Sequence, residues 1–226
     1  MKYFIDSFYS VQIAHIGLIP DGTRRWSNRE GIAFYDGYVH AMHKLIEIMR
    51  YCFKEDFCTI SVYLSSIQNF KRSESEITAF CKAEALLCNE LLISLADELN
   101  VKVKLSGKLS ILPDYFKEAL KIIEKKTEQN YLRNIYLLVA YNPLEEIIDA
   151  FQKTNINENF IDHLWVTQPL DLVIRTSGVT LLSNFLPLQS GYARLYTIDK
   201  LFNDTDITDY RRIISEFKGI ERVFGE

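Results

Sequence analysis

Short apolar runs alternate along the chain with longer stretches in which apolar residues recur every three or four positions. Residues 13–19 form the first run, which is almost wholly apolar, as is typical of a strand buried on both faces. Residues 73–99 follow the helical period, and Ser73 and Glu76 have the spacing of a capping box. The same pattern predicts strands at 59–64, 101–106, 134–141, 171–175 and 195–198, helices at 37–54, 113–126, 143–152 and 207–217, and a loop at 155–159.

This alternation predicts an α/β fold with a largely parallel central sheet covered by helices. We assign residues 1–226 to a single domain, because a chain of this length can bury one core of good size and contains no repeat or low-complexity linker.

Composition narrows the possible partners. The net charge of −4 and the absence of basic blocks argue against nucleic-acid binding. No uncharged run reaches the length of a membrane span and residues 1–10 do not resemble a signal peptide, so we expect no stable membrane insertion. The four cysteines form no metal-ligand pattern, and Cys81 and Cys88 have the spacing of packed small apolar residues. A reduced, cytoplasmic location is therefore expected.

The clearest chemical signal follows the first predicted strand. Asp21 could hold Mg²⁺, which needs only one or two carboxylates beside phosphate oxygens. Gly22 allows close backbone approach, and Arg24 and Arg25 offer planar donors for phosphate. This segment therefore indicates a diphosphate site, with a solvated loop at a strand end as the alternative.

Other polar segments also follow predicted strands, at residues 65–72, 141–142 and 175–185. Parallel strands end at one edge of their sheet, where such folds bind ligands. We therefore expect one crevice surrounded by Asp21, Arg25, Asn69, Arg72, Arg175 and Ser183. One acid among several arginines suits an anion that shares its charge with a metal.

These segments resemble the motifs of the cis-prenyltransferase family, of the undecaprenyl diphosphate synthase type. The similarity lies in residues 15–26, 63–72, 171–178 with 182–186, and the tail 221–225, in the family's order. The resemblance implies an α/β fold with an apolar tunnel, a homodimer, Mg²⁺ as cofactor, and coupling of an allylic diphosphate to isopentenyl diphosphate.

The resemblance also implies roles for particular residues. Asp21 would be the metal-linked acid, and the catalytic residues would be Asp21, Arg25, Ser66 and Asn69. Diphosphate binding would fall to Gly22, Thr23, Arg24, Arg25, Arg72, Arg175 and Ser183, and the substrate pocket to Trp26, Phe34, Tyr38 and Leu181.

Several positions depart from the family pattern. Thr23, Phe34 and Tyr38 stand where the family has asparagine, arginine and histidine, and they resemble the lavandulyl and cyclolavandulyl diphosphate synthase branch, which couples five-carbon units head-to-middle. Further departures are Asn142-Pro143, Val179, Leu181, Arg194 (in place of a metal-binding glutamate) and Val223. The second diphosphate site is therefore more altered than the first.

The leading hypothesis is Mg²⁺-assisted ionisation of an allylic prenyl diphosphate, followed by short-chain transfer, either regular or irregular (head-to-middle), to a second C5 or C10 prenyl diphosphate. One alternative is a single-substrate terpene synthase or cyclase, and another is a noncatalytic partner subunit. Phe34, Tyr35 and Tyr38 could shield a carbocation or simply pack in the core. His40 and His43 could suggest a metal, although a solvated helix face is the favoured interpretation, and His15 is expected to be structural.

Overall fold

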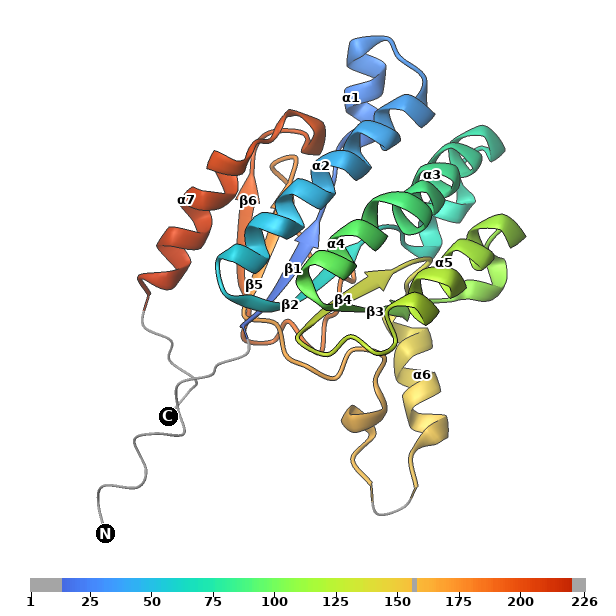
Figure 1. The fold of residues 1–226 in the computed structure, drawn as a ribbon, viewed down its shortest axis with the longest axis vertical. Coiled ribbons are helices and arrows are strands. Elements are labelled where there is room, and N and C mark those ends of the chain that lie inside the picture. The colour runs from blue at the N-terminus through green and yellow to red at the C-terminus, as the bar shows by residue number, and fades with distance from the viewer. Residues whose placement is uncertain (1–13, 156–157, 221–226) are drawn as a thin grey trace.

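In the computed structural model, which describes residues 14–155 and 158–220, six parallel strands form one sheet in the order β3-β4-β2-β1-β5-β6 (Figure 1). The predicted α/β class and parallel sheet are confirmed. The strands are β1 Ala14–Ile19, β2 Phe57–Tyr63, β3 Val101–Ser106, β4 Arg133–Leu138, β5 Leu172–Thr176 and β6 Arg194–Ile198.

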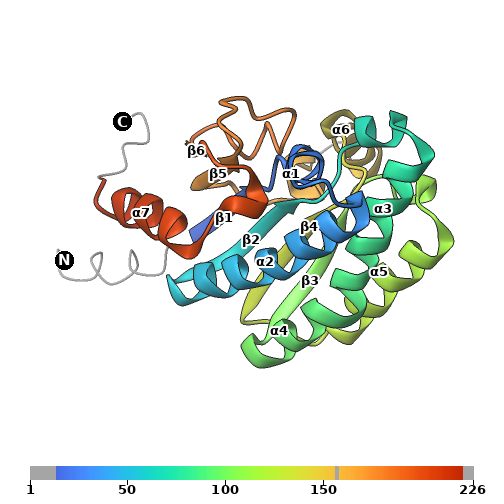
Figure 2. The ribbon, with the colours of Figure 1, turned by 90° about the horizontal axis from the view of Figure 1, so that it is seen from above.

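The helices within the described ranges are α1 Thr23–Glu30, α2 Phe34–Lys54, α3 Glu74–Leu86, α4 Leu92–Leu99, α5 Asp114–Lys126, α6 Pro143–Lys153 and α7 Ile207–Lys218. A π-helical turn, Leu87–Leu91, joins α3 to α4, so the helix predicted at 73–99 is nearly continuous. Helices α2 to α5 cover one face of the sheet (Figure 2). Their buried apolar faces and that of α7 form the larger core against the sheet. Cys81 and Cys88 are buried in it as predicted.

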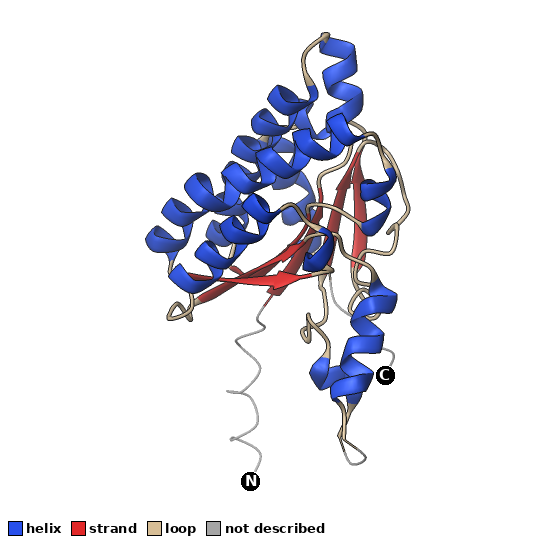
Figure 3. Ribbon diagram, turned by 90° about the vertical axis from the view of Figure 1, so that its right-hand side faces the viewer, coloured by secondary structure: helices blue, strands red, loops and turns tan. Residues whose placement is uncertain are grey.

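The opposite face carries a smaller core built largely from the segment before and after β5. Leu170, Phe185 and Leu186 pack there against residues of β1, β4 and β5. Helix α6 stands apart from the main helix layer, beyond the lower edge of the sheet (Figure 3). Both faces of the central strands are therefore covered, which explains why these strands are apolar throughout.

The ring of His15 joins three segments by hydrogen bonds, which confirms the structural role expected for this residue. Its ring lies 2.8 Å from Ser61 Oγ and 3.2 Å from the Pro169 carbonyl, so β1 is joined to β2 and to the segment before β5. Burial lowers the pKa of His15 to about 4, which keeps the ring neutral at physiological pH.

Helix α1 was not predicted. The sequence after the first strand was interpreted as a loop, but Thr23–Glu30 is helical, between Gly22 (φ 114°) and Gly31 (φ 67°). The segment is too polar to show an apolar period, and its contacts with distant residues stabilise it instead. Gly37 of α2 allows this docking, because a Cβ there would lie 1.9 Å from Ser27 Oγ.

Four predicted features lie wholly or partly outside the described residues: the interpretation of residues 1–10, the first position of strand 13–19, part of loop 155–159, and the tail 221–225 with Val223. Within residues 14–155 and 158–220, none of the helices has both the length and the apolar character that a bilayer span requires.

We expect Gly107→Ala to destabilise the protein strongly. Gly107 follows β3 with φ +146°, and an added Cβ would lie 1.8 Å from the backbone oxygen of Val139. Urea unfolding should show a loss of more than about 2 kcal/mol, since both strain and overlap contribute. Gly31→Ala is the matched control, because its φ is also positive but open space surrounds it, and it should cost about 1 kcal/mol. Equal losses for the two variants would contradict this account.

Candidate active site

A cavity of about 290 Å³ lies at the carboxyl ends of β1, β2 and β5. The chain runs from β1 to β2 on one side and places β5 on the other side of β1, so the cavity lies where the strand order changes direction. Most of the predicted site residues line it: Asp21, Gly22, Thr23, Arg24, Arg25, Tyr38, Ser66, Asn69, Arg72, Arg175 and Ser183.

Asp21 is the one carboxylate among the described residues that line the cavity. Its Oδ2 accepts from Arg175 Nη2 at 2.8 Å, and its Oδ1 accepts from Arg25 Nη2 at 3.3 Å. Its backbone is fixed by Thr176, whose hydroxyl accepts from Asp21 N and donates to Asp21 O at 2.8 and 2.7 Å. The two neighbouring strands β1 and β5 therefore hold the acid and its partner arginine together.

Arg175 is buried and carries a second set of contacts. Its Nη1 donates to Ser183 Oγ at 2.7 Å and to the carbonyl of Leu181. Its Nε is buried and has no hydrogen-bond partner in the described part of the chain. Because a buried unpaired donor is costly, this atom points to a site that a ligand completes.

The N-terminus of α1 faces the same cavity. Gly22 to Arg25 all line it, no acidic residue occupies the first turn, and no side chain caps the helix. The first backbone N–H groups of a helix lack intrahelical partners and carry partial positive charge, so this end suits an anion. Gly22 is required, because its φ is 114° and a Cβ would lie 2.9 Å from Leu201. The Arg24 side chain is engaged elsewhere, 3.1 Å from Glu76, and only its backbone is free to contribute.

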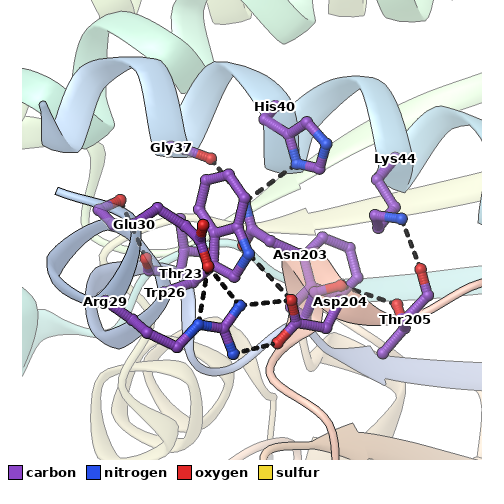
Figure 4. A network of polar contacts seen from close by, with 12 residues as sticks. Thr23, Trp26, Arg29, Glu30, Gly37, His40, Lys44, Asn203, Asp204 and Thr205 are labelled. Atoms are coloured by element: carbon purple, nitrogen blue, oxygen red, sulfur yellow. Dashed lines mark hydrogen bonds and ion pairs between the residues drawn. The ribbon is translucent and has the colours of Figure 1, made fainter. Parts of the chain in front are cut away.

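A network outside the cavity holds α1 in place (Figure 4). Asp204 accepts from Trp26 Nε1 at 3.0 Å and from both terminal nitrogens of Arg29 at 2.8 and 2.6 Å. Trp26 also stacks on His40 with ring centroids 5.0 Å apart. Asn203 donates to the Gly37 carbonyl at 2.8 Å, which joins the same segment to α2. The angle of α1 therefore depends on residues about 180 positions further along the chain.

Ser66 and Asn69 form a second group, on the turn that follows β2. Asn69 Oδ1 accepts from Ser66 N at 2.7 Å and from Ser66 Oγ at 3.1 Å, so each residue orients the other. Arg72 donates to Tyr38 OH at 3.4 Å, and burial is the main cause that raises the pKa of Tyr38. Tyr38 and Phe80 meet edge to face with centroids 6.1 Å apart, and both line the cavity. The apolar tunnel predicted from the resemblance would have to continue past these rings, and it stays a prediction.

Three of the predicted pocket residues do not line the cavity. Trp26 is turned away by Asp204 and His40, Phe34 lies one turn before Tyr38 at the start of α2, and the Leu181 side chain is 65% exposed. Arg194 is exposed at the start of β6 and also lies outside the cavity lining. The pocket roles predicted for Trp26, Phe34 and Leu181 therefore stay predictions, without support from the lining of this cavity.

The sequence interpretation also missed residues that support the site. Thr176 could have been found, since it directly follows Arg175 at a strand end. Asp204 carried no signal, because its role depends on contacts with a distant helix. Among the described residues no group of three His, Cys, Asp or Glu side chains forms a metal cage, so His40 and His43 are not part of one.

Comparison with known proteins identifies relatives of the chain. A sequence family described as "Putative undecaprenyl diphosphate synthase" matches residues 19–225. The tritrans,polycis-undecaprenyl-diphosphate synthase (geranylgeranyl-diphosphate specific) of Picrophilus torridus is 33% identical, over 94% of this chain and 89% of its own. The isoprenyl transferase of Campylobacter jejuni strain RM1221 is 30% identical, over 95% and 99%.

Two solved structures share the fold. Lavandulyl diphosphate synthase from Lavandula x intermedia, in complex with dimethylallyl diphosphate, matches with a TM-score of 0.87 at 25% identity, over 94% of this chain and 98% of its own. A probable undecaprenyl diphosphate synthase from Campylobacter jejuni matches with a TM-score of 0.76 at 28% identity, over 96% and 100%. The predicted family resemblance is confirmed.

We expect Asp204→Ala to weaken anion binding although Asp204 does not line the cavity. Loss of its contacts with Trp26 and Arg29 frees α1, so the affinity for inorganic pyrophosphate should fall about 5- to 10-fold, which corresponds to about 1–1.4 kcal/mol. Isothermal titration calorimetry would measure this. Glu30→Ala is the control, since it removes only the other carboxylate bound to Arg29 and should leave the affinity unchanged.

Proposed function

Because the chain belongs to the undecaprenyl diphosphate synthase family of prenyltransferases, we propose that it ionises a short allylic prenyl diphosphate and transfers the prenyl group to a second C5 or C10 prenyl diphosphate. One observation carries the proposal: Asp21 lies between Arg25 and Arg175, beside the uncapped N-terminus of α1. This arrangement combines positive charge for a leaving diphosphate with one carboxylate for a cation.

Mg²⁺ fits this donor set. It keeps several waters and takes one or two carboxylates plus substrate phosphate oxygens, so Asp21 could hold it without a cage of protein ligands. The orphaned Nε of Arg175 supports a ligand next to that acid. When bound, the ion neutralises charge on the departing diphosphate.

The residues divide between the two substrates. The backbone of Gly22 to Arg24 and the Arg25 side chain would hold the allylic diphosphate, while Arg72, Arg175 and Ser183 would hold the second one. Cleavage of the allylic C–O bond leaves its electron pair on the diphosphate oxygen, and fixed donors stabilise that charge. Ser66 and Asn69, which also line the cavity, would line the reaction centre.

A short substrate is supported by the size and lining of the cavity. A volume of about 290 Å³ is at the low end for ligand pockets, and a diphosphate takes part of it. The rings of Tyr38 and Phe80 supply aromatic surface to the cavity lining and could shield a carbocation. The fold similarity to a lavandulyl diphosphate synthase supports irregular, head-to-middle coupling.

The single-substrate alternative has one observation in its favour. Leu181 and Arg194 add no donor to the second site, and Arg175 is already engaged by Asp21. A terpene synthase or cyclase would need only the first site. A noncatalytic partner subunit is disfavoured, since such a protein would not need Asp21 and Arg25 in this arrangement.

We also propose a homodimer and a cytoplasmic location for the 226-residue chain, which we treat as a single domain. Helix α6 supports the dimer, because Leu144, Ile148 and Phe151 are 65%, 55% and 73% exposed and follow one another at helical spacing. An apolar face of this kind on a soluble fold marks a contact surface.

Asp21→Ala should lower turnover at least about 100-fold, because the charge on the leaving diphosphate loses its metal-linked acid. The assay incubates the protein and Mg²⁺ with dimethylallyl, geranyl and farnesyl diphosphates, singly and mixed, and identifies products by mass spectrometry. Asp114→Ala, which removes an exposed acid that does not line the cavity, is the control. Products only from mixtures support transfer, whereas a product of unchanged carbon count from one substrate supports the terpene synthase alternative. Unchanged activity of the Asp21 variant would refute the mechanism.

Ile148→Asp should convert the dimer to a monomer, because a charge in the centre of an apolar contact is left without solvation. Size-exclusion chromatography with light scattering measures the mass. Ile122→Asp on α5, at a position 37% exposed, should leave the dimer intact. A wild-type protein that is monomeric at about 50 μM, well above the dissociation constant of a stable dimer, would rule the surface out.

A further inference from the structure

A buried acid lies directly behind the cavity and takes no part in the mechanism above. Glu84 of α3 is 2% exposed and follows the cavity-lining Phe80 by one helical turn. Its one hydrogen-bond partner in the described chain is Ser65, whose Oγ donates to Glu84 Oε2 at 3.3 Å. Ser65 itself lines the cavity at the end of β2.

Ser65 is held in place between two groups. Its Oγ accepts from the backbone N–H of Ala140 at 3.2 Å while it donates to Glu84. A hydroxyl oxygen has two lone pairs, so one remains to accept a proton from the cavity side. Ala140 has φ +49°, an uncommon conformation for a residue with a side chain, which indicates that the backbone here is constrained.

No cationic side chain in the described part of the chain forms a hydrogen bond or ion pair with Glu84, although Arg72 donates to its neighbour Tyr38 at 3.4 Å. The titratable groups that face it within the described residues are Tyr38 from α2, Tyr115 from α5, and Cys81 and Cys88 from its own helical segment. Burial raises the pKa of both thiols, so all four groups are neutral at pH 7. Burial also raises the pKa of Glu84 to about 8, with the Ser65 hydrogen bond opposing the shift. An acid with such a pKa can both take up and release a proton near neutral pH.

A second buried glutamate shows what a structural acid looks like in the same chain. Glu146 of α6 accepts from Tyr141 OH, from Val166 N at 3.0 Å and from Gln189 Nε2 at 3.2 Å. Three donors satisfy that carboxyl and join separate segments. Glu84 has one weak hydrogen bond and joins only Ser65, so a structural role does not explain its burial.

We propose that Ser65 and Glu84 form a proton relay that ends the reaction in the cavity. The inference rests on the proposed function, because prenyl coupling and single-substrate cyclisation both produce a carbocation that must lose a proton. The relay lies where α3 borders the cavity, because Ser65 lines the cavity and Glu84 follows the cavity-lining Phe80 by one helical turn.

The proposed deprotonation conserves atoms and charge. A C–H bond next to the cationic carbon breaks, and its electron pair forms the C=C bond of the product. The proton passes to Ser65 Oγ while the hydroxyl proton of Ser65 passes to the carboxylate of Glu84. The protonated Glu84 then releases a proton to solvent before the next cycle, so no oxidant or further reactant is needed. Ser65 is the catalytic residue of this pair, and Glu84 acts through it.

Glu84→Gln tests the relay without opening a cavity, since glutamine has about the same volume as glutamate but cannot accept the proton. We expect kcat to fall at least about 10-fold, with KM for each prenyl diphosphate within about 2-fold of wild type. In the wild type, kcat should rise with pH as Glu84, with its pKa of about 8, becomes ionised. This rising limb of the pH profile should be absent from the variant. Products that form when water captures the carbocation, such as alcohols, should increase.

Two further variants and a control complete the experiment. Ser65→Ala should reproduce the loss, and Ser65→Thr, which keeps the hydroxyl, should restore most of the rate. Glu146→Gln removes the other buried carboxyl and should retain the wild-type pH limb and product ratio.

The outcomes separate the relay from the proposed function. If wild type turns over prenyl diphosphates but Glu84→Gln keeps its kcat, pH limb and products, the relay is wrong and the function stands. A loss confined to KM, with the pH limb retained, would show a structural role and would also overturn the relay. If wild type binds pyrophosphate but converts no prenyl diphosphate, the proposed function fails and the relay fails with it.

Discussion

The ion pair between Asp21 and Arg175 joins the ends of β1 and β5, and the candidate site is organised around it. Parallel pairing brings Ile19, the last residue of β1, opposite Arg175 of β5, and Asp21 follows two positions later in the short turn before α1, so the strand pairing and this turn together fix the approach of the two side chains. The pair leaves the guanidinium only partly satisfied, with Nε buried and unpaired. A buried guanidinium with one unpaired N–H donor costs free energy in the ligand-free protein. The same unpaired donor is available to bind an anion.

The second constraint is the docking of α1. An eight-residue helix is too short to be stable alone, so its contacts with α2 and with residues 202–205 must hold it. Gly22 and Gly37 permit the close approach, while Asp204 anchors the far side of the helix. The direction of the uncapped helix end, and with it the place where a diphosphate binds, is therefore set by distant parts of the chain.

The sequence alone predicts the sheet and most of the polar residues at the carboxyl ends of its strands. Apolar runs and strand ends are local features, and parallel pairing then brings Asp21, Arg72 and Arg175 together without further information. Helix α1, the outward turn of Trp26 and the anchoring by Asp204 depend on tertiary contacts that have no local pattern. Glu84 was missed for a related reason, since a glutamate on an amphipathic helix is expected to be solvated, and only the packed structure buries it.

Backbone strain is concentrated at the same edge of the sheet as the chemistry. Within the described residues, non-glycine positions with positive φ include Ala140 after β4 and Ser177, Ser183, Asn184 and Leu186 after β5. Such conformations cost about 1–3 kcal/mol each, so the two cores must supply the stability that these loops give up. The strained positions are next to groups that have to be held still: Ala140 N contacts Ser65, and Ser183 contacts Arg175. A site that combines charge stabilisation at the arginines with proton acceptance at Ser65 needs both groups fixed, because a shift of either would let water reach the cation first.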